Sequence, residues 1–293
     1  MNTRDLALFR AVVKTKNYTQ VAEQFHVSQP AVTQAIKRLE REFDAPLIKQ
    51  DHTHQQMLIT HAGQLLYNNS QAVHDSLELA HREIDAAKQP QIRFGLPPII
   101  GALFFPQVAK PLLAWGWLKQ LNVVERGSAE ILDDLAHGKL DIALVASAHP
   151  LHLHNVQTVS LGTRPFEVIV STDNPLAQRD RISFQELADQ PFIGLDDSFI
   201  HPRAFRDFCQ AAGVKPQILY QTADIAWMKS IVRANLGLGF LVKDAIFPNE
   251  GIVGLTITDS LREQFHIAVA YRKGYALSER EASLLQILLK IKV

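Results

Sequence analysis

Basic, hydroxyl and amide side chains gather on one face of a predicted helix near the start of the chain. With about 100° between successive residues, this face is made up of Thr33, Gln34, Lys37, Arg38 and Arg41. Lysine and arginine bind phosphate oxygens, arginine also makes paired hydrogen bonds to guanine, and glutamine pairs with adenine in the major groove. These residue types on one face indicate contact with double-stranded DNA. The alternative is a solvated face in an all-helical cap domain.

Two short helices around a turn are expected to position this face. The second begins at Ser28, an expected N-cap, and tolerates Pro30 in its first turn. Its opposite side is apolar and consists of Val32, Ala35, Ile36, Leu39 and Phe43. An earlier helix begins at Thr19, and His26 and Val27 break the pattern between the two. Such a pair, with a basic front on the second helix, is typical of a helix-turn-helix.

A polar segment and a long helix follow. Residues 47–59 have apolar ends around a polar centre, which predicts a two-stranded wing. His52 and His54 are either exposed wing residues or metal ligands, but no clear third and fourth ligand accompanies them. Residues 60–88 predict one helix whose narrow seam would pair with a second copy or pack on a neighbouring domain. The seam consists of Ala62, Leu66, Asn69, Val73, Leu77, Ala80 and Ile84.

After residue 89 the pattern changes to alternating strands and helices. Strands are expected at residues 92–96, 121–125, 142–145, 167–171, 192–195, 218–222, 238–242 and 266–271. Helices are expected at residues 103–113, 129–137, 183–188, 202–212, 225–234 and 278–291. This alternation predicts an α/β architecture with mainly parallel sheets, in which ligands bind beyond the carboxyl ends of the strands.

The composition excludes several classes of protein. The chain has 293 residues, a length that suggests two or three globular domains. It carries 30 basic and 30 acidic side chains, so its formal net charge is zero. A single cysteine, Cys209, excludes a disulfide framework within one chain, and a buried apolar role is expected for it. The apolar runs are too short for a membrane span, and charges interrupt the first residues where a secretory signal would be apolar. A cytosolic protein without a membrane partner is therefore expected.

Signatures of an enzyme are not found. The sequence has no Gly-x-Ser-x-Gly, no His-Glu-x-x-His and no phosphate-loop motif. Gly237 and Gly239 lack the third glycine of a dinucleotide fingerprint. Neither catalytic residues nor a metal or cofactor is therefore expected.

The first 65 residues resemble a known family. Residues 17–40, with Leu47, Ile48 and residues 58–63, are similar to the DNA-binding half of the LysR-type transcriptional regulators. More loosely, Gly127 with Ser128, residues 138–145 and residues 237–241 fit the second half of that family. Two positions depart from the family pattern. Gln50 stands in the wing where the family often has arginine, which removes a phosphate contact, and Asp44 stands where it often has glycine, which predicts a different helix ending.

The resemblance implies an α+β multidomain chain. It has a winged helix-turn-helix over residues 1–60, a linker helix for dimerisation over residues 61–88, and an effector-binding domain over residues 89–293. This last domain would be a two-lobed α/β unit similar to periplasmic binding proteins. Lobe I is expected at about residues 90–162 and 268–293, and lobe II at about residues 163–267. The DNA contacts are expected from Thr19, Ser28, Gln29, Pro30, Ala31, Thr33, Gln34, Lys37, Arg38, Arg41 and Lys49.

Effector contacts are expected where strands end and helices begin in the second half. Pro97 and Pro98 have no N–H, so backbone donors for an anion would begin at Ile99, unless the prolines only start a packed helix. Ser128 is either an N-cap or a ligand contact, and Arg203 is either a cation for an anionic effector or part of a surface ion pair. The full set comprises Pro98, Ile99, Ser128, Ser147, Phe199, His201, Arg203, Thr222 and Gly239.

The sequence therefore predicts a homo-oligomeric, ligand-responsive transcription factor, as a dimer or tetramer. Similarity to a branch with malolactic-system and acetate-responsive regulators favours a small carboxylate effector, with malate as the candidate. An acid that closes the cleft between the lobes would change the spacing of the DNA-binding heads. The rival prediction is an α/β solute-binding or catalytic protein with an accessory helical domain.

Overall fold

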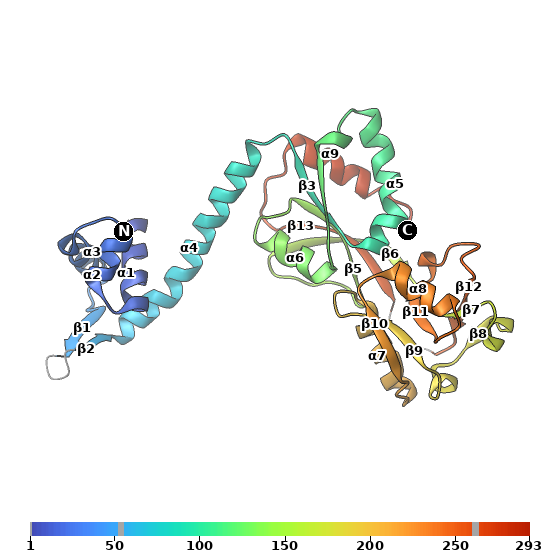
Figure 1. Cartoon of the computed structure of the whole chain (residues 1–293). Helices are drawn as coiled ribbons and strands as arrows, with labels where there is room; N and C mark the ends of the chain where they lie inside the picture. Colours follow the sequence, from blue (N-terminus) through green and yellow to red (C-terminus); the bar gives the residue numbers. More distant parts are fainter. Residues whose placement is uncertain (1, 52–55, 260–263) are drawn as a thin grey trace. The chain divides into compact units, whose positions relative to one another are not determined.

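The computed structural model describes residues 2–51, 56–259 and 264–293, and Figure 1 shows the course of the chain. Contacts divide the chain into two compact units, Met1–Lys88 and Gln89–Val293. His52 and His54 of the predicted wing lie outside the described residues.

The first unit is a helix-turn-helix with a two-stranded wing and a long final helix. Its elements are α1 (Thr3–Thr15), α2 (Tyr18–Gln24), α3 (Gln29–Glu42), β1 (Ile48–Asp51), β2 (Gln56–Ile59) and α4 (His61–Ala87). Asn17 caps α2 by accepting from two backbone N–H groups at its start. Val12 of α1, Val21 of α2 and Val32 of α3 meet in one core, where all three are fully buried. The apolar side of α3 is thereby covered and its polar side faces solvent.

The end of α3 corrects one prediction. Asp44 follows the helix in the left-handed conformation, with a φ of 46°, and the Ala45 N–H donates to Glu40 O at 3.1 Å. Glycine usually occupies this position, and aspartate is one of the few other residues that tolerate it. The helix therefore ends as a glycine-terminated helix would, and the different ending predicted from Asp44 is wrong.

Lobe I of the second unit is built on a five-stranded sheet. The strand order is β4 (Leu121–Glu125), β3 (Ile92–Leu96), β5 (Ile142–Ser147), β13 (Phe265–Arg272) and β6 (Val156–Arg164). The helices are α5 (Pro98–Ala114), η1 (Leu118–Gln120), α6 (Ser128–Ala136) and α9 (Glu279–Leu288). Ile142 and Leu144 of β5 share a core with α5 and α9, whereas Ala143 and Val145 share another with α6. Helices on both faces explain the unbroken apolar run of β5.

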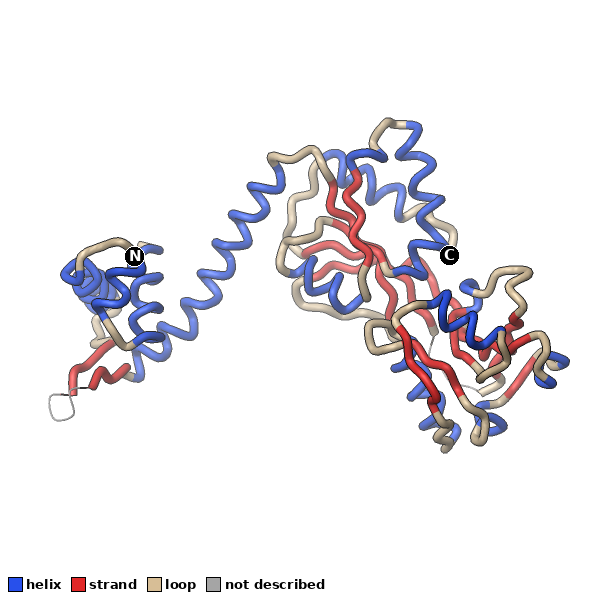
Figure 2. The backbone as a smooth tube through the Cα atoms, viewed as in Figure 1, coloured by secondary structure: helices blue, strands red, loops and turns tan. Residues whose placement is uncertain are grey.

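Lobe II has a four-stranded sheet and a separate strand pair, shown in red with its helices in blue in Figure 2. The sheet order is β11 (Gly239–Val242), β7 (Phe166–Ser171), β12 (Ile252–Ile257) and β8 (Arg181–Ile182), and the pair is β10 (Ile218–Thr222) with β9 (Phe192–Leu195). The helices are η2 (Pro175–Gln178), η3 (Phe184–Leu187), α7 (His201–Ala212), α8 (Ile225–Arg233) and η4 (Lys243–Ala245). The chain enters lobe II at Pro165, between β6 and β7, and returns between β12 and β13.

The prediction of mainly parallel sheets is wrong. In lobe I, β13 runs antiparallel to both β5 and β6, and in lobe II, β7 runs antiparallel to both β11 and β12. The sequence did not predict β6, β8 or β12. Side chains of β6 are mostly half-buried or exposed, so the strand lacks an apolar run. Its partner β13 lies far away along the chain, and local alternation carries no information about such a pairing.

Candidate functional site

The predicted DNA contacts form an exposed surface on the first unit. Exposed side chains on or beside α3 are Thr19, Ser28, Gln29, Pro30, Ala31, Gln34, Lys37, Arg41 and Lys49, with Thr33 half-buried among them. Ser28 precedes α3 without making a capping bond through its side chain, so its hydroxyl is available to a phosphate. The start of α3 adds the positive end of a helix dipole, although Pro30 has no N–H and the Ala31 N–H donates to Ser28 O at 2.9 Å. The surface therefore brings together the residues that are predicted to bind phosphates and those that are predicted to read base edges.

Arg38 does not act as a free cation on this surface. Its Nε and Nη2 donate to the two carboxylate oxygens of Asp5 in α1, at 2.9 and 2.6 Å. The Asp5 side chain is only 7% exposed, and its hydrogen bond with Arg38 lowers the pKa of its carboxyl. A guanidinium held by both oxygens has a fixed orientation. The structure thus places Arg38 in an ion pair that joins α1 to α3, and its contact with DNA stays a prediction.

In the second unit, three helices begin at one small cavity between the lobes. Pro97, Gly127 and Ile200 are the N-cap residues of α5, α6 and α7. The lining consists of Pro97, Ile99, Gly127, Ser128, Ala146, Ser198, Phe199, Ile200, His201 and Phe265. The first amides of a helix have no partner within it and carry partial positive charge. The cavity is therefore suited to an anion, although no lysine or arginine occurs among its described lining residues.

Four predicted effector contacts, Ile99, Ser128, Phe199 and His201, come together in this lining. Ser128 Oγ accepts from the Ala146 N–H at 2.9 Å, so its own proton is available to another acceptor. The lining residues Ser198, Ile200 and Phe265 were not predicted. They come from a loop and a strand that only the folded chain brings to the helix starts, and no local pattern marks them.

His201 is a buried and neutral member of the lining. Its side chain lies among Phe166, Phe199 and Phe265, and the residue is 2% exposed. Burial lowers its pKa to about 3. Nε2 accepts from the Val242 N–H at 3.4 Å, whereas Nδ1 has no hydrogen-bond partner within the described chain. Since Nε2 accepts, Nδ1 carries the proton and can donate to a bound acceptor.

The two lobes touch at the edge of this cavity. A Cβ added to Gly127 of lobe I would lie 2.2 Å from the carbonyl oxygen of Ser198 in lobe II, so only glycine fits there. The cavity volume is about 20 Å³, close to the space that one water molecule needs. An acid of malate's size does not fit this space. The predicted closure of the cleft by an effector stays a prediction, because the lobes are already in contact in this arrangement.

Three predicted effector contacts lie outside this lining. Ser147 Oγ donates to His149 O at 2.6 Å, and Thr222 Oγ1 accepts from the Asp224 N–H at 3.0 Å, so both hydroxyls stabilise local turns. A Cβ at Gly239 would lie 2.7 Å from a side-chain carbon of Ile169, which assigns this glycine to close packing within lobe II.

Two further predicted contacts also lie outside the cavity lining. Arg203 is exposed on α7, so the predicted cation for an anionic effector is not found there. Pro98 lines a different cavity of about 340 Å³, together with Ile99 and residues of α8. These five residues do not line the cavity at the start of the three helices, and their roles as effector contacts stay predictions.

Metal binding, thiol reactivity and a membrane span were also sought in the described residues. Within residues 2–51, 56–259 and 264–293, no group of three or more His, Cys, Asp or Glu side chains could hold a metal ion. Burial raises the pKa of the Cys209 thiol to about 11, which keeps it protonated at neutral pH. No helix in the described part of the chain is long and apolar enough to cross a membrane.

A winged helix-turn-helix joined to a two-lobed ligand-binding unit defines a DNA-binding transcriptional regulator that responds to effectors. Residues 3–64 match the family described as bacterial regulatory helix-turn-helix protein, lysR family, and residues 85–291 match the LysR substrate binding domain. The second match alone spans more than half of the chain. The chain therefore belongs to the LysR family, and the predicted family and fold class are confirmed.

Similar proteins include regulators with different names. The malolactic fermentation system transcriptional activator of Lactococcus lactis subsp. lactis is 28% identical over 293 residues, covering 100% of this chain and 99% of the relative. The DNA-binding transcriptional dual regulator OxyR of Escherichia coli is 25% identical over 287 residues, covering 96% and 92%.

Solved structures show the same fold. A mutant of Corynebacterium glutamicum OxyR aligns with a TM-score of 0.58 at 21% identity, covering 99% of this chain and 92% of that one. The effector binding domain of QuiR in complex with shikimate aligns with a TM-score of 0.60 at 19% identity, covering 68% and 95%.

Proposed function

We propose that this transcriptional regulator binds a small carboxylate, with malate as the first candidate, in the cavity between its lobes. The observation that carries the proposal is the meeting of three helix N-termini at that cavity. Carboxylates are stabilised by such amides without a lysine or arginine. The Ser128 hydroxyl and the His201 Nδ1–H supply two further donors. All these groups donate, which favours an acceptor-rich ligand over an amine.

Two comparisons support the choice of ligand class. One full-length relative is named for the malolactic fermentation system. This name is the reason for choosing malate among the small carboxylates. Other relatives are named as hydrogen peroxide-inducible genes activators. This chain has one cysteine, whose raised pKa disfavours the thiolate that peroxide chemistry requires. A disulfide switch within one chain is therefore not favoured.

Binding requires the lobes to move apart, because the acid is larger than the present cavity. We infer that the effector stabilises a wider arrangement at the expense of the one in which Gly127 touches Ser198. A ligand shifts such an equilibrium only as far as its affinities for the two arrangements differ. Contacts between subunits would transmit the movement of the lobes and change how two DNA-binding domains bind an interrupted palindrome.

Malate added to the full-length protein is expected to raise the temperature at which the second unit unfolds. Ser128→Ala should weaken this binding about tenfold, because a hydrogen bond to a charged group contributes roughly 1.5 kcal/mol. Calorimetric titration measures the affinity, and Ser160→Ala, an exposed serine on β6, is the matched control. Operator binding without effector should be equal in all three proteins. Failure of malate, succinate and citrate to bind would contradict a carboxylate effector.

We further propose that the protein works as a homo-oligomer, a dimer or tetramer, in the cytosol, where its DNA lies. Two surfaces support assembly. Val73, Leu77 and Ile84 follow one seam of α4 and are at least 40% exposed. In the second unit, the edge strands β4 and β10 expose apolar side chains, among them Val123, Ile218, Leu219 and Tyr220. Apolar edge strands of this kind are usually covered by a partner.

Tyr220→Asp is expected to weaken assembly, because it places a charge on the apolar edge strand. Tyr220 is 45% exposed and contacts Trp227 with ring centroids 5.8 Å apart, so the change leaves the core of lobe II intact. Sedimentation at micromolar concentration should show smaller particles than for the parent protein. Gln286→Asp, on the exposed side of α9, is the control. Equal sedimentation of all three would remove β10 from the interface.

A further inference from the structure

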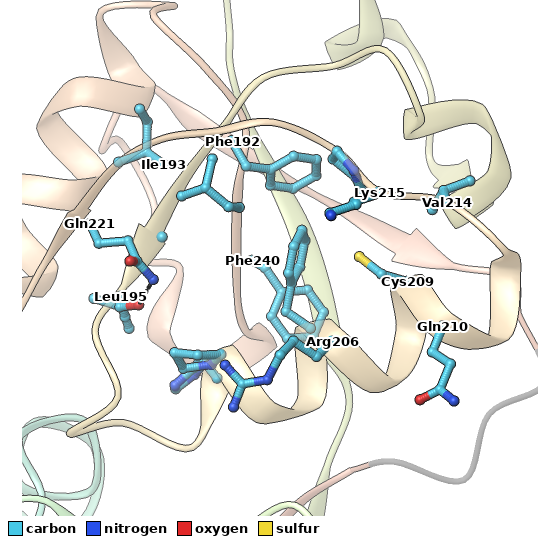
Figure 3. A pocket seen from close by; sticks show the side chains of 16 residues that line it. Phe192, Ile193, Leu195, Arg206, Cys209, Gln210, Val214, Lys215, Gln221 and Phe240 are labelled. Atoms are coloured by element: carbon cyan, nitrogen blue, oxygen red, sulfur yellow. Dashed lines mark hydrogen bonds between the residues drawn. The ribbon is translucent and has the colours of Figure 1, made fainter.

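A larger pocket lies within lobe II, and it shares only His201 with the described lining of the cavity where the three helices meet. It is formed by β9, β10, α7 and the connection between α7 and β10, and its volume is about 440 Å³. Figure 3 shows Gln221 and Leu195 on one side and Lys215, Val214 and Cys209 on the other, with the Phe192 and Phe240 side chains between them. Pockets of this size accept small organic molecules.

The body of the pocket is apolar and aromatic. Phe192, Phe205 and Phe240 line it, together with Cys209 and Val214. The rings of Phe192 and Phe205 lie 4.8 Å apart, and those of Phe205 and Phe240 lie 5.6 Å apart, so they form one continuous wall. Such a wall stabilises a hydrocarbon by removing its surface from water. A small, strongly hydrated acid such as malate would gain little here.

The open edge of the pocket carries positive charge. Lys215 lines it, is exposed, and has no ion-pair partner within the described chain. Arg206 also lines it, and its ion pair with Asp197 at 3.3 Å is exposed on both sides, so a ligand can replace it at little cost. No aspartate or glutamate occurs among the described lining residues. The charge complements an anionic head group outside an apolar body.

A buried polar group closes the inner side. His201 lines this pocket as well as the cavity between the lobes, and its Nδ1 has no hydrogen-bond partner in the described structure. A buried donor without a partner is uncommon unless a water or ligand satisfies it. Because the ligand proposed for the inter-lobe cavity already takes this donor, the second ligand is inferred from the aromatic wall and the charged edge.

We propose that the pocket in lobe II is a second ligand site, which takes a monocarboxylic acid with a medium-length hydrocarbon body. The hydrocarbon lies along the wall of phenylalanines, and the carboxylate faces Lys215 and Arg206 at the edge. The site differs from the cavity between the lobes in position and in ligand class. It goes beyond the proposed response to malate and does not depend on it.

Cys209 provides a direct test, because it is the only cysteine of the chain and lines the pocket. Octanoate is the probe, and the rate at which N-ethylmaleimide modifies Cys209 in the full-length protein is the measurement. Saturating octanoate is expected to slow modification at least tenfold. Octan-1-ol, which has the same chain without the charge, should bind roughly tenfold more weakly. Malate should leave the rate unchanged.

Two variants separate the pocket from nonspecific binding of a fatty acid. Lys215→Gln should weaken protection by octanoate roughly fivefold to tenfold. Lys290→Gln, an exposed lysine at the end of α9, should leave it unchanged. The proposal is overturned if octanoate does not protect Cys209, if octan-1-ol protects equally well, or if both lysine variants behave like the parent. Protection by malate at equal concentration would also overturn it, whereas loss of malate binding alone would contradict only the response proposed for the inter-lobe cavity.

Discussion

Gly127→Ala is expected to give, without any effector, the DNA footprint that the parent protein shows only when it is saturated with effector. A Cβ at this position would lie 2.2 Å from Ser198 O, whereas real Cβ atoms stay at least 3.0 Å from such neighbours. The obstacle is a backbone oxygen, which no side-chain rotation removes. The lobes must therefore separate by about an ångström, so the variant favours the wider arrangement that we assign to the effector-bound protein.

The affinity for malate is a second measurement that tests the Gly127→Ala variant. If malate binds only the wider arrangement, raising the population of that arrangement increases the apparent affinity for malate. The largest possible factor of increase is the inverse of the fraction of the parent protein that adopts the wider arrangement. Footprinting and calorimetric titration measure the two effects. Gly194→Ala is the control, because its Cβ would meet nothing closer than 3.4 Å. A Gly127→Ala protein with the parent footprint and a normal response would exclude lobe separation as the signal.

The sequence predicted the DNA-binding half well because its signals are local. Caps, a short turn and the period of α3 each depend on residues within one or two turns of helix. In the second unit, Ser128 and Ile99 were also found from a local rule, namely that helix starts bind anions. Ser147 and Thr222 satisfied a similar rule but use their hydroxyls in their own turns. A polar residue at a strand end does not reveal which way its hydrogen bond goes.

Long-range contacts account for the remaining differences. Phe265 reaches the cavity because β13 returns to lobe I beside β5, and Gly127 acquires its importance from Ser198, which belongs to the other lobe. The pairing of Arg38 with Asp5 joins residues of two different helices. Helical spacing correctly placed Arg38 on the exposed side of α3, but spacing within one helix cannot show that a neighbouring helix supplies a buried carboxylate.

This ion pair changes how the DNA-binding face must be tested. Replacing Arg38 by alanine would leave the Asp5 carboxylate buried without its partner and loosen the contact between α1 and α3. Because pairing lowers the Asp5 pKa, the pair stabilises the fold above the pKa of an unfolded aspartate, and this stability is lost as the pH falls through the folded value. Weak DNA binding by such a variant would not distinguish lost docking from lost folding.

Lys37→Ala combined with Arg41→Ala is therefore the informative change, and it is expected to reduce operator affinity strongly without affecting stability. Both side chains are exposed, and neither takes part in an ion pair within the described chain. Each phosphate contact contributes about 0.9 to the slope of log affinity against log salt. For each DNA-binding head, the double variant should lose roughly 1.8 from this slope and about fiftyfold in affinity at 0.1 M salt. Fluorescence titration of a labelled operator at several salt concentrations measures both. Lys14→Ala, an exposed lysine in the last turn of α1, should bind as the parent does, and an unchanged slope in the double variant would show that α3 presents a different face to DNA.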